Sequence, residues 1–185
     1  MNQINNDPFI SRQIDLNLNI GQSYGDELIE LDLMQYATSV NVSTGAHAGD
    51  PAYINKSLQA CKDHENLSVG ALISYPDLLG FGMRKIQLSN EEIKATVIAQ
   101  LGALAALAKV NKYDLVHVRP HGYLYHQMAA NYSVAETVAK AVQEFSKWLI
   151  IIGPYSNVLK EVSVWTNVRV AFESRFDLRY RNDGS

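Results

Sequence analysis

The 185-residue sequence has one cysteine, five prolines and no excess of positive charge. The single cysteine, Cys61, cannot form an internal disulfide, which excludes a disulfide-stapled scaffold and indicates a reducing compartment. Because its neighbours are predicted to be helical, we interpret Cys61 as a small core residue rather than a nucleophile. Lys and Arg number 16 against 19 Asp and Glu, giving a net charge of −3. This balance argues against nucleic acid as a partner.

Signals for membranes and export are also missing. No apolar run is judged long enough to cross a bilayer, so no membrane partner is expected. Residues 1–7 are polar and Asn-rich, without the basic and then apolar order of a signal peptide. We therefore expect a cytoplasmic protein with a flexible N-terminus over residues 1–11. Hydrophobic residues make up 47% of the chain, which predicts a single globular domain over residues 1–185.

Apolar patterning predicts six short strands with helices between them. The strands are expected at residues 14–18, 39–43, 67–72, 114–119, 148–152 and 168–172. The run 148–152 is apolar throughout, as in a strand buried on both faces. Regular alternation of strand and helix predicts an α/β fold with a parallel sheet, either doubly wound or a partial barrel. In both architectures, ligands bind beyond the carboxyl ends of the strands.

Capping residues mark the helix starts. Asp50 followed by Pro51 has the form of an N-cap with proline at the first helical position. Residues 89–92 and 133–136 both read as capping boxes, with serine first and glutamate three residues later.

Polar residues gather where the strands are expected to end. Asp15, Asn17 and Asn19 alternate with apolar residues, so they share one face of the first strand. We favour a ligand site, with an internal hydrogen-bond network or an exposed edge as alternatives. The second strand runs into a turn in which glycines flank His47 on both sides, beside a helix N-terminus that favours an anion. We favour a functional His47 over a hydrogen-bonded turn residue.

Two later segments add further candidates. The loop 74–84 contains Asp77 and Arg84, which either belong to a site or form an ion pair that holds the loop. In the segment 117–125, His117 and Arg119 share a strand face and His121 follows at the turn. Such a group could bind a carboxylate and move protons, or the histidines could bond main-chain carbonyls. Pro120 interrupts the segment and excludes a helical zinc-binding pair.

These motifs resemble those of the LamB/YcsF family, whose bacterial members form the A subunit of the ATP-dependent 5-oxoprolinase. The matching segments, in order, are 15–22, 39–50, 70–77, 80–84 and 117–125. The resemblance implies an irregular, incomplete (β/α) barrel similar to the polysaccharide-deacetylase-like superfamily. It also implies hydrolytic opening of 5-oxo-L-proline to L-glutamate, with ATP as co-substrate and subunits B and C as partners. A metal is not expected, because the changed positions described below weaken a cage of carboxylates and imidazoles.

The resemblance carries site roles over by position. The implied catalytic residues are Asp15, His47, Asp77, His117 and His121. The implied substrate-binding residues are Asn17, Asn41, Asp50, Arg84, Arg119 and Tyr125. Because a lactam is a stable amide, ATP would activate its oxygen by phosphorylation, and a His or Asp would act as the base for attacking water.

Several family positions have changed in one direction. Asn19 and Gln22 stand where the family has acids, Leu72 where it has histidine, and Ser174 where it has aspartate, although Glu173 lies next door. Amides keep the shape of the acids but remove the charge and the base. The alternative is therefore a catalytically degraded member that binds a small acid or a partner subunit without turnover. A metal-dependent hydrolase acting on acylated sugars is a third hypothesis, by analogy of fold alone.

The chain is also shorter than members of the family, and nothing in it corresponds to their C-terminal portion. An incomplete barrel leaves an open sheet edge. We therefore expect a homodimer, or a complex with a second polypeptide.

Overall fold

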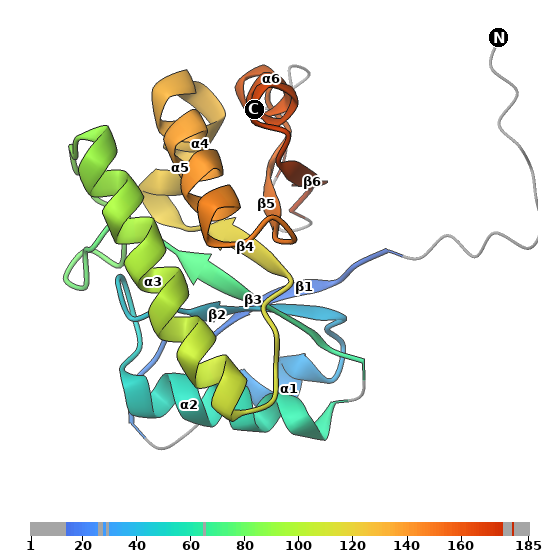
Figure 1. Ribbon diagram of the computed structural model, residues 1–185. Coiled ribbons are helices and arrows are strands. Elements are labelled where there is room, and N and C mark those ends of the chain that lie inside the picture. The colour runs from blue at the N-terminus through green and yellow to red at the C-terminus, as the bar shows by residue number, and fades with distance from the viewer. Residues whose placement is uncertain (1–13, 26–27, 29, 65, 176–178, 180–185) are drawn as a thin grey trace, which may run out of the picture.

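A single sheet of six parallel strands forms the centre of the computed structural model (Figure 1). The structure describes residues 14–25, 28, 30–64, 66–175 and 179, so the expected flexible N-terminus lies outside the described residues. The strands are β1 (Asn17–Ile20), β2 (Ser39–Ser43), β3 (Ser68–Ile73), β4 (His117–Pro120), β5 (Ile150–Pro154) and β6 (Arg169–Glu173). All six predicted strands are present. Only β2 has the predicted bounds, and the others lie one to three residues later in the chain.

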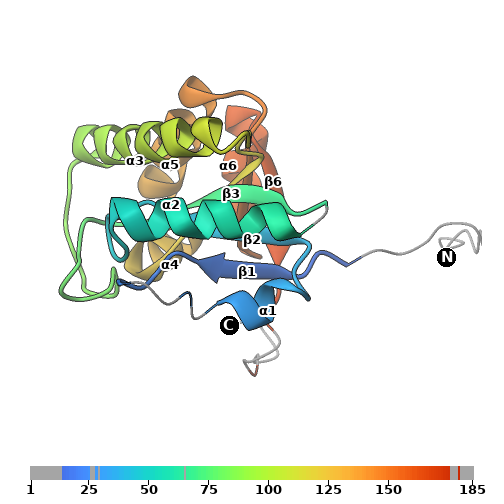
Figure 2. The same ribbon diagram turned by 90° about the horizontal axis from the view of Figure 1, so that it is seen from below.

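The strands lie side by side in chain order, β1 to β6. The helices between them are α1 (Leu31–Met34), α2 (Pro51–Ala60), the 3-10 helix η1 (Cys61–Asp63), α3 (Asn90–Val110), α4 (Gly122–Ala130), α5 (Tyr132–Phe145) and α6 (Asn157–Thr166). A doubly wound sheet reverses its strand order at a switch point, whereas right-handed crossovers in a constant direction all turn to one face. The order therefore decides between the two predicted architectures in favour of an open half-barrel, as Figures 1 and 2 show.

The two faces of the sheet differ sharply in chemistry. Side chains that point to the helices are apolar and fully buried, among them Ile20, Val40, Val42, Ala71, Ile73, Val118 and Ile151. Each such Val, Ile or Leu contributes about 1.5–3 kcal/mol by leaving water. The alternate residues point to the concave face, where Asn41, Ser43 and His117 are buried polar groups. The core is therefore built outside the half-barrel, and the polar groups are collected inside it.

The helix starts follow the predicted capping in two places out of three. The Asp50 carboxylate accepts from the amides of Ala52 and Tyr53, at 2.8 and 3.0 Å, so Asp50 is the N-cap of α2. Ser89 and Glu92 form the reciprocal bonds of a capping box at α3.

The predicted box at 133–136 is wrong. Helix α5 begins at Tyr132, and the Asn131 side chain accepts from the amides of Ser133 and Val134. Asn131 is the one residue between the end of α4 and the start of α5, and it has the extended backbone that an N-cap needs.

Two further expectations about apolar residues are corrected. The apolar pattern places Trp148 in a strand buried on both faces, but β5 begins at Ile150 and Trp148 is 81% exposed. Helix α3 is long and apolar enough to cross a bilayer by length and composition, contrary to the expectation that no such run exists. In the fold it packs against α5 and β3 and buries Ile93, Val97, Leu101, Leu104 and Ala108. It therefore serves as a core helix here.

The interpretation of Cys61 as a core residue is confirmed. The residue is fully buried, and its thiol donates to the carbonyl oxygen of Ser57 at 3.2 Å. Burial raises the pKa of the thiol to about 12, so the reactive thiolate is not formed near neutral pH.

The corrected start of α5 can be tested by comparing two alanine variants. Asn131→Ala removes the side chain that caps two amides and should lower the free energy of unfolding by about 1 kcal/mol. Ser133→Ala should cost less than about 0.5 kcal/mol, because its exposed hydroxyl bonds only Asn90 and the main chain supplies the amide. Urea unfolding of both variants measures the difference. A larger loss for Ser133→Ala would restore the serine as the cap.

Candidate functional site

A ladder of polar side chains lines the concave face of β1 and β2. The Asp15 carboxylate accepts from the hydroxyls of Thr38 and Ser39, at 2.5 and 2.7 Å. The fully buried Asn41 amide donates to the side-chain oxygens of Asn17 and Asn19. The predicted row of polar residues is therefore present, and it forms the internal hydrogen-bond network that the sequence left as an alternative.

His117 joins this ladder from β4 by reaching over β3. Asn41, Gly70 and His117 are register neighbours, and the His117 Nε2 donates to the Asn41 side-chain oxygen at 2.8 Å. The imidazole can cross because Gly70 has no side chain, and a Cβ there would overlap the ring. Burial lowers the pKa of His117 to about 4, against the opposing effects of the Asp15 charge and a hydrogen bond to the Val40 backbone. His117 is thus a neutral, buried member of the network.

His47 and His121 meet beyond the carboxyl ends of the strands. Their rings stack with centroids 4.2 Å apart, although the two residues come from loops after β2 and β4. Main-chain bonds hold the loops together: the Asp77 amide donates to the Ala46 carbonyl and the Tyr123 amide to the Gly82 carbonyl. The glycine turn around His47 is confirmed, since Gly49 has a φ of +77° and lies too close to the Gly21 carbonyl for a side chain.

The bonding partners of the two imidazoles differ. The His121 Nε2 lies 2.9 Å from the Phe81 carbonyl oxygen, which can only accept, so the proton is on Nε2 and Nδ1 keeps its lone pair. With the Gln22 amide in the orientation found here, its nitrogen lies 2.8 Å from the His47 Nε2 and donates to it, which assigns the His47 proton to Nδ1. Burial, followed by the charge of His121, lowers the pKa of His47 to about 3. Burial also lowers the pKa of His121. Both rings are therefore neutral near pH 7.

Asp77 and Arg84 form the ion pair that the sequence offered as an alternative. The Asp77 carboxylate is buried and also accepts from the Gly80 amide at 2.9 Å. The Arg84 guanidinium beside it lowers the pKa of Asp77. These bonds close the loop from residue 77 to residue 84, so the structure gives both residues a part in holding it.

Arg119 and Tyr125 lie on the other side of the concave face. The Arg119 guanidinium donates two bonds to the Glu173 carboxylate, at 2.8 and 2.6 Å, and stacks over the Tyr125 ring. This pair links β4 to β6 across β5, with both side chains largely buried. Glu173 therefore neutralises the arginine that was expected to hold a substrate carboxylate.

Two residues of this region were missed from the sequence, namely Gln100 and Ser74. Gln100 extends from α3, where its amide donates to the Ser74 carbonyl at 2.8 Å and its oxygen accepts from the Ser74 amide at 3.0 Å. Thr44 donates to the same oxygen at 2.7 Å. A signal was available: Gln100 lies three residues after Val97 on the apolar face of α3, where a polar residue needs a partner.

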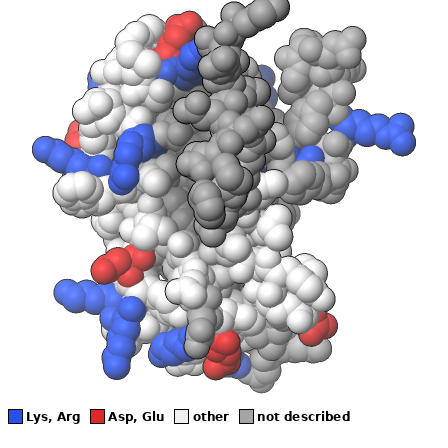
Figure 3. Space-filling view, turned by 90° about the vertical axis from the view of Figure 1, so that its right-hand side faces the viewer, with Lys and Arg blue, Asp and Glu red and all other residues white. Residues whose placement is uncertain are grey.

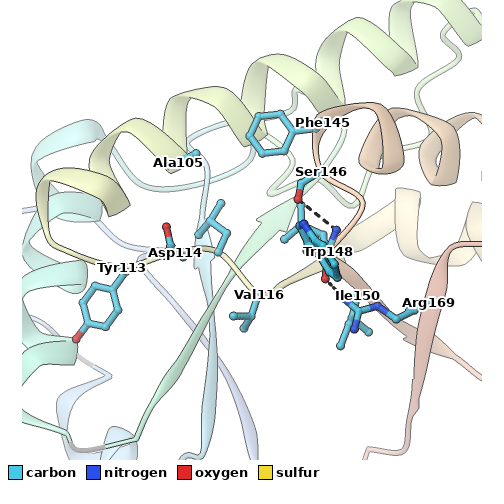
Figure 4. Close-up of a pocket in the computed structure, with 11 residues that line it drawn as sticks. Ala105, Tyr113, Asp114, Val116, Phe145, Ser146, Trp148, Ile150 and Arg169 are labelled. Atoms are coloured by element: carbon cyan, nitrogen blue, oxygen red, sulfur yellow. Dashed lines mark hydrogen bonds between the residues drawn. The ribbon is translucent and has the colours of Figure 1, made fainter.

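A cavity in the described part of the chain lies away from these residues. It has a volume of about 590 Å³ and is lined by Tyr113, Phe145, Trp148 and Arg169 among others, at the amino ends of β4, β5 and β6 (Figure 4). No group of three or more His, Cys, Asp and Glu residues suited to a metal ion occurs within the described residues. On the face shown in Figure 3, both basic and acidic side chains occur, several of them toward the left and lower edges.

Comparisons with known proteins show which sequences this chain is similar to. The model of the LamB/YcsF family matches residues 14–185. The A subunit of 5-oxoprolinase from Chloroflexus aurantiacus is 40% identical over 174 residues, which is 93% of this chain and 68% of the relative. Its counterpart from Pyrococcus abyssi is 37% identical over 175 residues, 94% of this chain and 68% of the relative.

Solved structures show the same likeness. The crystal structure of a lactam utilization protein from Thermus thermophilus has a TM-score of 0.89 at 34% identity, covering 94% of this chain and 70% of that one. A proposed cellobiose-phosphate cleavage protein from Enterococcus faecalis has a TM-score of 0.54 at 12% identity, covering 85% of this chain and 67% of that one. This second likeness concerns the fold alone.

The crossing of His117 over β3 predicts opposite outcomes at two glycines. Gly70→Ala should lower the free energy of unfolding by about 2 kcal/mol, because the added Cβ displaces the His117 ring. Gly102→Ala is the matched control, since a Cβ there meets nothing within 4 Å and helix propensity should raise stability by about 0.5–1 kcal/mol. Urea unfolding measures both. A Gly70→Ala variant as stable as the parent would contradict the crossing.

The lowered histidine pKa values predict a pH dependence of stability. His47 and His117 have folded pKa values of about 3 and about 4, below the unfolded value of about 6.5. Between pH 6.5 and 4 the unfolded chain therefore binds more protons. The free energy of unfolding should fall with falling pH in this window, with a slope approaching roughly 2.7 kcal/mol per pH unit for two protons.

Urea unfolding between pH 4.5 and 7.5 measures this slope. His47→Gln should reduce it by about one proton. An unchanged slope in that variant would mean that His47 is already protonated in the folded protein.

Proposed function

The chain belongs to the LamB/YcsF family, as its motifs predict, and from this we propose that it acts in the manner of the A subunit of 5-oxoprolinase. It binds 5-oxo-L-proline beyond the carboxyl ends of the strands and, with subunits B and C, takes part in the ATP-dependent opening of the ring to L-glutamate. The observation that carries the proposal is the stacked pair of neutral imidazoles, His47 and His121.

His121 is suited to be the general base. Its Nε2–H is bonded to the Phe81 carbonyl, which leaves Nδ1 as the basic atom, and its lowered pKa keeps that atom unprotonated near pH 7. Water would give a proton to Nδ1 as its oxygen bonds to the lactam carbon. The C–N bond then breaks, and the ring nitrogen accepts a proton.

ATP would transfer a phosphoryl group to the lactam oxygen, so breaking the C–N bond leaves an acyl phosphate of glutamate. A second water would hydrolyse this acyl phosphate to glutamate and inorganic phosphate. The two arginines of the candidate site fit poorly as phosphate ligands, because Arg84 and Arg119 are already paired with Asp77 and Glu173. We therefore assign no phosphate contact to them.

The contact with partner subunits is proposed at the loop after β3. Leu78, Leu79, Phe81 and Met83 are exposed there although they are large and apolar, and Leu79 is 93% exposed. An exposed apolar group of this kind beside a site favours protein docking. A partner bound to this loop would cover the region beyond the carboxyl ends of the strands, where His121 lies. A homodimer remains a proposal for the open sheet edges.

A second candidate function is binding without turnover. It is favoured by the positions that differ from the family motifs: Gln22 bonds His47 as an amide, and Leu72 is a fully buried apolar residue on the concave face. Neither residue can carry a proton. In this function the chain binds the lactam or the partner subunits and releases no glutamate.

Glutamate release separates the two functions. The chain is mixed with subunits B and C, 5-oxo-L-proline and ATP, beside a full-length relative under the same conditions. We expect turnover by the parent, a loss of about 100-fold or more in His121→Ala, and no change in the control His64→Ala, which lies at the end of η1. No glutamate from the parent while the relative is active would leave binding without turnover. Full activity of His121→Ala would remove His121 as the base.

A further inference from the structure

Two buried polar atoms near the imidazole pair have no hydrogen-bond partner. Among the residues that the structure describes, the His47 Nδ1 and the Ser74 Oγ are the buried side-chain atoms in this condition. Both residues are almost completely buried. Leaving a buried donor unpaired is costly, so native proteins rarely do so without a reason.

The two residues converge on one place. A Cβ built on Gly82 would overlap the Ser74 Oγ and would lie 3.1 Å from the Cβ of His47 and 3.1 Å from the Cδ2 of His121. Gly82 has a φ of +71° and no side chain, so the loop can pass close to the histidine pair at this residue. Gly82 therefore lies against the unpaired Ser74 hydroxyl and against both histidines of the stacked pair.

A glutamine holds each of the two residues, through the ring of His47 and through the main chain of Ser74. Gln22 occupies the His47 Nε2 and leaves the proton on Nδ1. Gln100 bonds both the amide and the carbonyl of Ser74, so the serine main chain cannot rotate without losing two bonds. Pre-organised donors of this kind are typical of sites that bind an oxygen atom carrying negative charge.

We propose that Ser74 and His47 form a donor pair for the lactam oxygen of the ligand, with Gln22 as the positioning residue that holds His47 in the Nδ1–H form. The proposal rests on the proposed function and deepens it. The Ser74 hydroxyl and the His47 Nδ1–H bond the carbonyl oxygen, while His121 lies beside the carbonyl carbon. A neutral lactam suits neutral donors, because no buried charge is left unpaired.

A ligand-binding role and a structural role for Ser74 have opposite effects on stability. A structural serine loses a hydrogen bond when it is replaced, whereas Ser74→Ala removes an unpaired buried hydroxyl. We expect the melting temperature of Ser74→Ala without ligand to equal or exceed that of the parent. We expect its affinity for 5-oxo-L-proline, by calorimetry, to fall roughly three- to tenfold.

Ser57→Ala is the matched control. Ser57 is as deeply buried as Ser74, but its hydroxyl donates to the Tyr53 carbonyl within α2. We expect this variant to melt at a lower temperature and to bind 5-oxo-L-proline as the parent does. If Ser74→Ala melts lower and binds as the parent does, Ser74 is structural and the proposal is wrong. If the parent itself does not bind 5-oxo-L-proline, both the proposed function and the donor pair are wrong.

The tautomer of His47 gives a readout that needs no ligand. Two-bond proton–nitrogen correlation spectra of ¹⁵N-labelled protein distinguish Nδ1–H from Nε2–H, and the signal is assigned by its loss in His47→Asn. We expect Nδ1–H in the parent. In Gln22→Glu the carboxylate accepts instead of donating, so the proton should move to Nε2 and the affinity for 5-oxo-L-proline should fall. Nε2–H in the parent would overturn the role of Gln22.

Discussion

The hydrogen bond between His117 and Asn41 is the interaction on which the concave face depends. It crosses an intervening strand, so it requires a glycine at position 70 and a fully buried asparagine at position 41. That asparagine in turn needs Asn17 and Asn19 as partners for its amide. This one contact across β3 thus explains why β1, β2 and β4 carry polar side chains on the concave face, where a closed core would carry apolar ones.

The mouth of the half-barrel is assembled from segments far apart in the chain. The loops after β2, β3 and β4 bond one another through main-chain groups, and α3 reaches into them through Gln100. A helix of the outer layer therefore positions a residue of the inner one. This arrangement explains how two histidines from separate loops stack without a direct hydrogen bond between them.

Much of the fold could be predicted from the sequence, because apolar periodicity and capping residues are local signals. The strand boundaries were less accurate, since apolar residues such as Trp148 occur before main-chain pairing begins. At the site, Asp77 and Arg84 are seven residues apart, so their pairing could be foreseen as one of two outcomes. The pairing of Arg119 with Glu173 could not, because it depends on how β4, β5 and β6 lie side by side. Ser74 and Gln100 needed three-dimensional contacts to be noticed.

Because side chains alternate between the two faces of each strand, selection for folding and selection for function act on different residues. Residues that face the helices, such as Val40 and Val42, determine whether the chain folds. Residues that face inward, such as Asn19 and Leu72, can change without disturbing that outer layer. Mutations at the functional face are thereby insulated from mutations in the core, so a lineage can lose, regain or exchange its chemistry on an intact scaffold. The evolvability of this fold follows from the two-residue repeat of a β-strand.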